Sequence, residues 1–431
     1  MVVAPVRLEP QLSSASAAGS SATHVRVPRA AQAGRDAVGN VTMSGVDRPS
    51  VNVRGLFIGP LPEPITGQSL ACRVFLDALR AHADVDVVDL SKPTFRQGVD
   101  STSRVAEVLR IVRDVRRKQR GADFIYFTIA ESLAGNAKDL LIYVACFPRL
   151  DRMIVHLHGG AGMRELMRGR LGLLRRMNAF FLRRMGAIVV LGERHLDVFS
   201  GAAPDSRLRI VPNFAQDELF VEPAAIDAKF ASLQPLRMLF LSNLLPGKGH
   251  AELVQAFAGL DSQRRETLRI DFAGGFESES AKREFLDSIG AHPQLQYHGT
   301  VHGERKRALF AAAHVFCLPT YYPYEGQPIS ILEAYASGCA VITTDHSGIF
   351  DTFADGRNGI AVAKRSPASL QAALERILDR PQDLRTIALH NRRTASEQYT
   401  TARYNDLLLR IVLGVAAPVA QPAAASTGVC Q

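Results

Sequence analysis

Two carboxylates stand eight positions apart in the stretch YEGQPISILEAYASG, residues 324–338. The stretch follows the apolar, β-type run AHVFCLPT and precedes a second such run, CAVITTD. In an open α/β sheet, ligands bind outside the carboxyl ends of the strands, and Pro328 suits the first turn of a helix. We therefore expect Glu325 in a loop and Glu333 about two turns into the helix. Both carboxylates can then accept hydrogen bonds from the vicinal hydroxyls of a polyol.

The start of the same helix can also hold an anion. The backbone amides of Gly326 and Gln327 are expected to point outward at the positive end of the helix dipole, where they can meet hydroxyl or phosphate oxygens. Gly326 allows a ligand to come close to the backbone because it has no side chain. A helix cap followed by a solvated glutamate gives the same letters, so the spacing of the two glutamates alone leaves both interpretations open.

Two series of short apolar runs form the frame around this stretch, and helix-length segments separate the runs. Runs of this kind, bounded by turn residues, are typical of parallel strands that helices cover on both faces. The pattern predicts an α/β fold with two doubly wound, Rossmann-like domains. The first series is VRGLFIGP, ADVDVVDL, ADFIYFTI, RMIVHLHGG, AIVVLG and RIVPNF, and the second is RMLFLSN, RIDFAGG, LQYHGT, HVFCLP, AVITTD and GIAV.

Periodicity is lost between residues 213 and 235, and the domain boundary is placed there. The first domain is expected at 50–215 and the second at 216–400, with a closing helix at 401–413. The last amphipathic segment has no strand after it, so it could pack on either domain. Residues 1–49 and 414–431 are rich in small residues without periodicity and are predicted to be disordered tails.

The composition is that of a globular protein with a large core, because 47% of the 431 residues are hydrophobic and 22% are charged. A formal charge of +9 favours anionic partners such as phosphates, membrane surfaces or nucleic acid without choosing among them. The five cysteines are widely spaced and form no CxxC pair, so neither a disulfide framework nor a zinc site is indicated. No membrane span or secretory signal is recognisable, and a cytoplasmic location is expected.

Four motifs in their order along the chain resemble the GT-B glycosyltransferases of family 4, which are retaining and metal-independent. They are SNLLPGKGHAELVQAF, IDFAGG, EGQPISILEAYASG and DHSGIFDTFADGRNGIAV. The resemblance covers residues 51–413 and is strongest over 238–363. It implies that the two domains face each other across a cleft, with the first binding the acceptor and the second binding the nucleotide-sugar donor. It implies neither a cofactor nor a metal.

The resemblance also implies roles for individual residues of the donor domain. Glu325 would hold hydroxyls of the donor sugar, and Glu333 would bind the ribose of the nucleotide. Gly326, Gln327 and Pro328 would offer backbone contacts to the sugar. The family often has an aromatic or aliphatic residue where Gln327 stands, and this departure leaves the identity of the sugar open.

Lys248 of the PGKG motif matches the family lysine that neutralises the donor diphosphate. A cation is needed there because the leaving nucleoside diphosphate gains charge as the glycosidic bond breaks. Asn243 stands where the family usually has an arginine, five positions before that lysine. An asparagine can donate a hydrogen bond but carries no charge, so half of the expected cationic clamp is missing.

His158 and Gly67 are the candidates in the first domain. His158 of HLHGG ends a strand and matches a family histidine near the donor sugar, although a satisfied core histidine has the same sequence context. His156 is expected to point to the opposite face of the strand, packed or facing solvent. Gly67, in the loop GPLPEPITGQS after the first strand, would allow a close approach to donor or acceptor, although an isolated glycine is most often part of a turn.

An arginine-rich segment at 163–185 follows HLHGG directly and carries seven arginines against one glutamate. Its apolar residues lie close to one helical stripe, and a basic amphipathic helix of this kind suits an anionic bilayer. An ordinary packed helix with a solvated basic face would have the same pattern. The stripe consists of Met163, Met167, Leu171, Leu174, Phe181 and Met185.

The sequence therefore predicts a retaining transferase that moves a hexose from a nucleotide diphosphate sugar to a lipid-linked or polysaccharide precursor, in bacterial-type exopolysaccharide or lipopolysaccharide synthesis. We favour mannose carried on GDP over a UDP sugar, and a peripheral place at the inner face of an anionic membrane. Two other classes stay open. A GT-B sugar-nucleotide epimerase would share the donor pocket, and a basic nucleic-acid-binding protein is disfavoured because the arginine cluster lacks interleaved Tyr or Trp.

Overall fold

The computed structural model describes residues 53–91, 101–169 and 172–417. The predicted tail at 1–49 lies outside these residues, as does 418–431. The predicted second tail begins three residues too early, because the last helix continues to Ala416.

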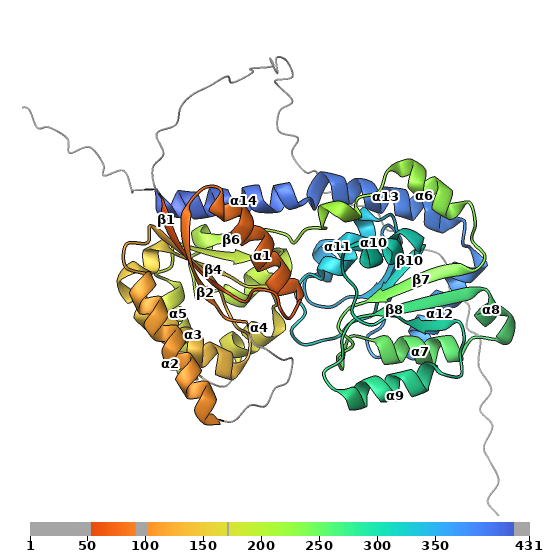
Figure 1. The fold of residues 1–431 in the computed structure, drawn as a ribbon, viewed down its shortest axis with the longest axis horizontal. Coiled ribbons are helices and arrows are strands. Elements are labelled where there is room, and N and C mark those ends of the chain that lie inside the picture. The colour runs from red at the N-terminus through yellow and green to blue at the C-terminus, as the bar shows by residue number, and fades with distance from the viewer. Residues whose placement is uncertain (1–52, 92–100, 170–171, 418–431) are drawn as a thin grey trace, which may run out of the picture. The chain divides into compact units, whose positions relative to one another are not determined.

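The first sheet has six parallel strands in the order β2-β1-β3-β4-β5-β6 (Figure 1). Its inner strands β3, β4 and β5 are buried along their whole length, as expected for strands covered on both faces. The strands are β1 Arg54–Gly59, β2 Asp84–Asp89, β3 Phe124–Thr128, β4 Met153–His156, β5 Ala187–Val190 and β6 Leu208–Ile210.

The second sheet also has six parallel strands, in the order β12-β11-β10-β7-β8-β9. All twelve apolar runs of the sequence are strands, and the predicted fold class is confirmed. The strands are β7 Leu236–Leu241, β8 Leu268–Ala273, β9 Leu295–Tyr297, β10 Val315–Leu318, β11 Ala340–Thr344 and β12 Gly359–Val362.

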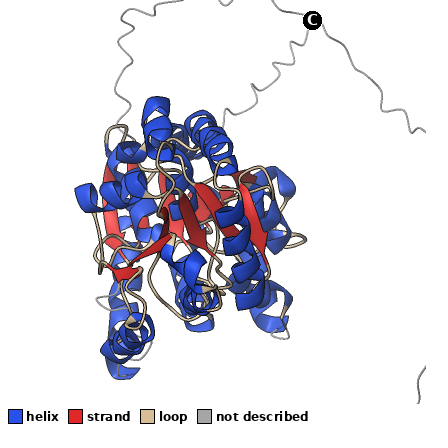
Figure 2. Cartoon of the chain, turned by 90° about the vertical axis from the view of Figure 1, so that its right-hand side faces the viewer, coloured by secondary structure: helices blue, strands red, loops and turns tan. Residues whose placement is uncertain are grey.

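Helices lie on both sides of the strands (Figure 2). Those that follow the first four strands are α1 Gly67–Arg80, α2 Ser101–Lys118, α3 Leu133–Ala145, and after β4 both α4 Ala161–Arg168 and α5 Gly172–Leu182. Those of the second half are α6 Pro223–Phe230, α7 His250–Ala258, α8 Ser262–Glu266, α9 Glu279–Ile289, α10 Gly303–Ala312, α11 Ile329–Ala336, α12 Pro367–Asp379, α13 Asp383–Gln398 and α14 Thr401–Ala416.

The C-terminal amphipathic segment is two helices that pack on different sheets. Helix α13 contacts α6 and α11 of the second half, whereas α14 contacts α1, β3 and β4 of the first (Figure 1). Tyr404, Leu408 and Val412 of α14 are buried, and the ring of Tyr404 lies 4.7 Å from that of Phe214. The segment therefore packs on both domains: α13 joins the second half, and α14 returns the chain to its first half.

The Asp-Val-Asp at 84–86 lies in strand β2, where both aspartates are exposed and the residues alternate between the faces of the sheet.

The arginine-rich segment is two short helices, α4 and α5. Met163, Met167, Phe181 and Met185 of its apolar stripe are buried in the core of the first half, so this stripe cannot face a bilayer.

Strand order determines where a ligand site can form. In the first sheet the chain leaves β1 for β2 on one side and returns to β3 on the other, and in the second sheet β7 lies in the same way between β8 and β10. A crevice opens at such a switch point because the loops after the two strands diverge. The loops after β1, β3, β7 and β10 are therefore expected to take part in a ligand site.

Candidate functional site

A cavity of about 650 Å³ lies at these loops, and both halves of the chain contribute to its wall. It is lined by the segment before α1, the loops after β3 and β4, the PGKG loop after β7, and the loop and helix after β10. All nine residues chosen from the sequence line it, and what each does there remains a prediction. They are Gly67, His158, Asn243, Lys248, Glu325, Gly326, Gln327, Pro328 and Glu333.

Lys248 and Glu325 form an ion pair inside the cavity. Lys248 Nζ lies 2.6 Å from Glu325 Oε2, and the two side chains are 12% and 10% exposed. Thr320 Oγ1 donates a second hydrogen bond to the same carboxylate oxygen at 3.2 Å. Gly249 has a left-handed φ of +89°, and a Cβ at this position would lie 2.5 Å from the carbonyl oxygen of Pro319. Only glycine therefore fits this turn of the loop. The PGKG motif thus brings the lysine to the carboxylate.

Glu333 also has a lysine partner. Its Oε1 accepts a hydrogen bond from Lys306 Nζ at 2.7 Å, and its side chain is 2% exposed. Helix α11 begins at Ile329, with Pro328 at its N-cap. Glu333 is therefore little more than one turn into the helix, and the expected depth of about two turns is wrong. Its carboxylate nevertheless reaches the cavity wall.

The residues between the two glutamates hold the two halves of the chain together. A Cβ at Gly326 would lie 2.1 Å from the carbonyl oxygen of His158, so the close approach that this glycine permits is to the first half of the protein. The Gln327 side chain accepts a hydrogen bond from the backbone N–H of Asn213 at 2.6 Å. The Asn213 side chain donates in turn to the Gln327 carbonyl at 2.7 Å. The residue that departs from the family pattern thus serves an internal contact.

His158 is neutral in this environment. Burial lowers its pKa to about 3, and its Nε2 atom is shielded from solvent and has no hydrogen-bond partner among the described residues. The expectation that His156 points to the opposite face is wrong, because residues two apart on a strand share a face. The two imidazole rings lie 4.0 Å apart, and His156 is held by the Tyr126 hydroxyl at 2.6 Å. His158 can therefore act as a neutral hydrogen-bonding group and not as a cation.

Glu131, which the sequence analysis missed, lines the cavity from the loop after β3. Its carboxylate accepts a hydrogen bond from the backbone N–H of Gly162, near the start of α4, at 3.2 Å. Burial raises the pKa of Glu131 to about 7, and the charge of Glu325 contributes to this rise. Hydrogen bonds from the backbone N–H groups of Met163, Gly160 and Gly162 act in the opposite direction. Near neutral pH this side chain exists in both protonation states, so it can donate as well as accept a hydrogen bond.

Asn243 and Gly67 take modest places in the wall. The Asn243 side-chain oxygen accepts a long hydrogen bond of 3.4 Å from the backbone N–H of Gly275. Gly67 is the first residue of α1, after a capping box in which Thr66 and Ser69 bond to each other's backbone. A Cβ at Gly67 would meet Ile329 at an ordinary 4.0 Å, so local packing leaves room for a side chain there.

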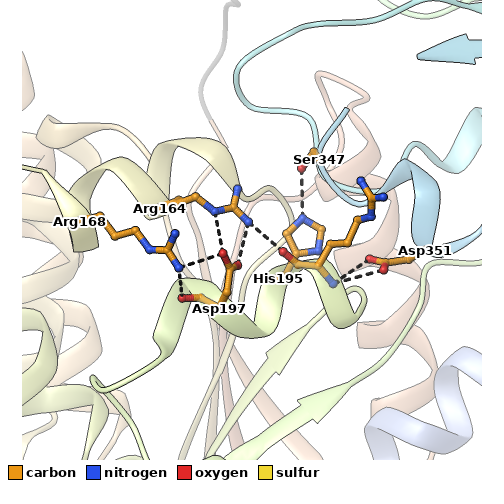
Figure 3. Close-up of polar contacts among 7 residues, drawn as sticks. Arg164, Arg168, His195, Asp197, Ser347 and Asp351 are labelled. Carbon is orange, nitrogen blue, oxygen red and sulfur yellow. Dashed lines mark hydrogen bonds and ion pairs between the residues drawn. The ribbon is translucent and has the colours of Figure 1, made fainter. Parts of the chain in front are cut away.

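Polar contacts beside the cavity join the first half to the loop after β11 (Figure 3). His195 Nε2 lies 3.1 Å from the Ser347 hydroxyl, and Ser347 has a left-handed φ of +50°. The backbone N–H of Arg194 donates to the Asp351 carboxylate at 3.2 Å. Asp197 binds Arg164 and Arg168 of α4 at 2.9 Å each and so ties the start of the arginine-rich segment to this region.

The sequence contains only weak signals for Lys306 and Glu131 as site residues, namely their positions relative to the predicted helices and strands. Glu131 follows the end of a strand at a switch point, but an isolated glutamate carries no motif. Lys306 belongs to the run GERKR at the start of a helix, which looks like a solvated charged face. The ion pair to Glu333 spans 27 positions and exists only in the folded chain.

Within the described part of the chain, no three His, Cys, Asp or Glu side chains are grouped as metal ligands. The described helices include none that is long and apolar enough to cross a membrane.

The second half matches a known protein family. The model of the family described as "Glycosyl transferases group 1" matches residues 224–394, which include Lys248, Lys306, Glu325 and Glu333. The matched segment is less than half of the chain. Transferase activity of the whole protein, the assignment to family 4 and the retaining outcome remain proposals.

One curated relative extends the sequence match beyond this domain. The MMP alpha-(1->4)-mannosyltransferase of Mycolicibacterium hassiacum is 27% identical over 215 residues, which are 48% of this chain and 50% of the relative. The matched segment thus spans only half of the relative's length.

Solved structures share the whole fold. The Anabaena Alr3699/HepE, in complex with UDP and glucose, matches with a TM-score of 0.63 and 16% identity over 84% of this chain and 100% of its own. WaaG, a glycosyltransferase involved in lipopolysaccharide biosynthesis, matches with a TM-score of 0.63 and 17% identity over the same shares. At these identities the structures show a common fold, the two-domain GT-B arrangement.

Proposed function

We propose that the enzyme transfers a hexose from a nucleoside diphosphate sugar to a lipid-linked or saccharide acceptor, with retention at the anomeric carbon. The observation that carries the proposal is the pairing of both motif glutamates, Glu325 and Glu333, with lysines inside one cavity of a group 1 domain. Lysines suit the diphosphate, whereas carboxylates suit the hydroxyls of a sugar and a ribose. A nucleotide sugar is the ligand that needs both.

In this proposal Lys248 turns from Glu325 toward the diphosphate when the donor binds. The bond between the anomeric carbon and the phosphate oxygen breaks, and its electron pair leaves with the nucleoside diphosphate. Lys248 and the amides at the start of α11 stabilise the charge that develops there. The acceptor hydroxyl attacks the same face of the sugar and passes its proton to the leaving phosphate oxygen. The carboxylate of Glu325 is freed to hold sugar hydroxyls and takes no covalent part.

The sugar and the nucleotide are chosen from indirect support. The name of the mannosyltransferase relative supports mannose, and the UDP and glucose bound in HepE support a UDP sugar for that protein. GDP-mannose is the first donor to test and UDP-glucose the second. The role of WaaG in lipopolysaccharide biosynthesis and the name of the mannosyltransferase relative support an acceptor that is itself a saccharide or a lipid-linked precursor.

The outer side of α5 and the neighbouring end of α3 form a candidate membrane-binding surface, which would bring the enzyme to a lipid-linked acceptor. Exposed apolar side chains gather there, and the rings of Phe147 and Phe180 stack at 6.2 Å. Arg184 lies over the Phe180 ring at 3.8 Å. We name this surface the α5 patch; it consists of Leu141, Val144, Phe147, Leu173, Met177 and Phe180 with the exposed arginines Arg175, Arg176, Arg183 and Arg184. Apolar rings among arginines suit the interface of an anionic bilayer.

Liposome binding tests the α5 patch. Association with anionic vesicles should weaken as salt is added and should be lost when Arg175, Arg176, Arg183 and Arg184 become glutamate, while activity on a soluble acceptor persists. Equal binding to neutral and anionic vesicles would remove the membrane proposal.

A panel of nucleotide sugars tests the transferase proposal itself. Release of nucleoside diphosphate is measured with lipid extracts as acceptor, and the anomeric configuration of the product is determined by NMR. We expect release that depends on the acceptor and a product with the configuration of the donor. Conversion of the nucleotide sugar without an acceptor would favour the epimerase, and an inverted product would exclude a retaining mechanism.

A further inference from the structure

The cavity has fewer positive than negative side chains. Among the described residues that line it, the lysines are Lys248 and Lys306, no arginine is present, and four glutamates contribute carboxylates. A donor with a charged diphosphate must therefore bind where carboxylates outnumber cations. Under these conditions each lysine carries an unusually large share of the attraction for the ligand.

Lys306 is placed to take part in binding. It lies in the first turn of α10, after the last strand on its side of the second sheet, and its side chain is 13% exposed. Its Nζ donates to Glu333 Oε1 and to Gln216 Oε1, each at 2.7 Å. An ammonium group has three N–H donors, and the described residues accept two from Lys306. The third N–H is available to an oxygen of a bound ligand.

We propose that Lys306 is a second cation of the nucleotide site and contacts the nucleotide half of the donor beside Glu333. The inference rests on the proposed function, because it takes the cavity ligand to be a nucleoside diphosphate sugar. It places a second positive charge in the cavity, on helix α10, where Asn243 supplies none. Lys248 serves the diphosphate from the loop after β7, and Lys306 serves the nucleotide from α10.

The two lysines should differ in when they act. Lys248 stabilises charge that grows as the glycosidic bond breaks, so its contribution is larger in the transition state than in the bound donor. The nucleotide beside Glu333 does not change during the reaction, and a contact there binds substrate and transition state equally. Lys306 should therefore set the affinity for nucleotide and the donor KM and leave kcat nearly unchanged.

Lys306→Met tests the inference because methionine keeps an unbranched side chain of similar length and removes the charge. Calorimetric titrations with UDP, GDP and ADP as probes should show affinity for the preferred nucleotide about ten- to hundred-fold weaker than in the natural protein, the range expected for one hydrogen bond to a charged group. Lys306→Arg should keep most of the affinity because it restores the cation.

Arg305→Met is the matched control. Arg305 precedes Lys306 on the same helix, is exposed and does not line the cavity. Its loss removes the same net charge from the same element, and nucleotide affinity should stay within about two-fold of the natural protein because exposed charges are screened. Equal losses in Arg305→Met and Lys306→Met would reduce the effect to net charge and overturn the inference.

The remaining outcomes are distinguishable. If the natural protein binds a nucleoside diphosphate and a folded Lys306→Met binds it as tightly, Lys306 does not contribute to nucleotide binding and the inference is wrong while the proposed function stands. If the natural protein binds none of the three probes, the proposed function fails and the inference falls with it. A drop in kcat at unchanged donor KM in Lys306→Met would place the lysine at the reacting bond and also contradict the inference.

Discussion

The two sides of the cavity present different chemistry. The side built on the second sheet holds two lysine–glutamate pairs, Lys248 with Glu325 and Lys306 with Glu333, at 2.6 and 2.7 Å. The side built on the first sheet holds the neutral imidazole of His158 and a carboxyl group, Glu131, whose pKa lies about 7. The second side thus offers two ion pairs that a ligand must separate. The first side offers an uncharged imidazole and a carboxyl group that is partly ionised near pH 7.

This difference indicates how a nucleotide sugar would be shared between the two halves. A diphosphate and a ribose call for cations and carboxylates, which the second side supplies. Hydroxyls of a transferred sugar or an acceptor need donors and acceptors without a fixed charge, which the first side supplies. Substitutions on the second side should therefore have large effects that depend on salt, and substitutions on the first side should have smaller effects that depend on pH or on hydrogen-bond geometry.

Lys248→Ala is expected to give the largest effect. A hydrogen bond to a charged group is worth about 1.5 to 3 kcal/mol, which corresponds to roughly ten- to over hundred-fold in rate. Because the charge of the leaving group grows in the transition state, kcat should fall more than the donor KM rises. Steady-state kinetics with saturating acceptor measures the two constants. Near-normal turnover in a folded Lys248→Ala would show that this lysine is not the diphosphate ligand.

The folding of Lys248→Ala must be checked separately because it leaves the Glu325 carboxylate, 10% exposed, without its partner. Lys248→Ala combined with Glu325→Gln removes both charges of the pair. The difference in thermal unfolding between the two variants measures how much the unpaired Glu325 carboxylate destabilises the fold.

Asn243→Arg in the Lys248→Ala background should recover part of the lost rate, up to about ten-fold, because one charge-assisted hydrogen bond is restored. Asn243 lines the cavity, and its own hydrogen bond to Gly275 is long at 3.4 Å, so little is lost by replacing it. The gain should shrink as salt is added. If the arginine restores nothing at low salt and product affinity is also unchanged, position 243 does not face the diphosphate.

His158→Ala tests the neutral side of the cavity. One hydrogen bond from an uncharged group is worth about 0.5 to 1.5 kcal/mol, so kcat/KM should fall about two- to ten-fold. Burial lowers the pKa of His158 to about 3, and the imidazole is therefore uncharged at pH 6 and at pH 8. The ratio of variant to natural rate should be the same at both values. A ratio that changes between them would show that His158 gains charge in the working enzyme.

The alternation of apolar runs and helix-length segments predicts all twelve strands, because an apolar run bounded by turn residues is a local signal that does not depend on distant contacts. Residues that line the cavity could be chosen in advance from short motifs, Lys248 through the resemblance of its PGKG loop and the two glutamates through their place around a helix start. Lys248 lies in a glycine loop, and Glu325 and Glu333 flank a helix start. Their positions in sequence show which loops they occupy.

The partners of these residues could not be predicted in the same way. Lys306 reaches Glu333 across 27 positions and Gln327 reaches Asn213 across 114, and no periodicity records such contacts. The stripe at Met163 and Met167 shows the opposite limit, because a buried face and a membrane-facing face have the same apolar spacing. Only packing distinguishes them, and in the structure the exposed apolar residues lie elsewhere on α5.

The smallest effect is expected from Glu131→Gln, seen in stability as a function of pH. The folded pKa of Glu131, about 7, lies above its ordinary value of 4.5 because burial disfavours the charged carboxylate. Below pH 4.5 the group is protonated in both the folded and the unfolded chain, so its burial carries no desolvation penalty for a charge. As pH rises from 4.5 toward 7, the unfolded chain releases the proton first, so the free energy of unfolding falls; above pH 7 the penalty is constant.

Glutamine has the shape of the protonated acid and does not titrate, so the variant lacks this loss. The free energy of unfolding of the natural protein relative to Glu131→Gln should therefore decrease between pH 5 and pH 7 and change little from pH 7.5 to 8.5. Urea denaturation at these values measures the difference, with Glu165→Gln, an exposed glutamate of α4, as the control. A difference that stays constant from pH 5 to 8 would show that the carboxyl group of Glu131 is ionised throughout. The first side of the cavity would then carry a full negative charge, and the contrast with the second side would disappear.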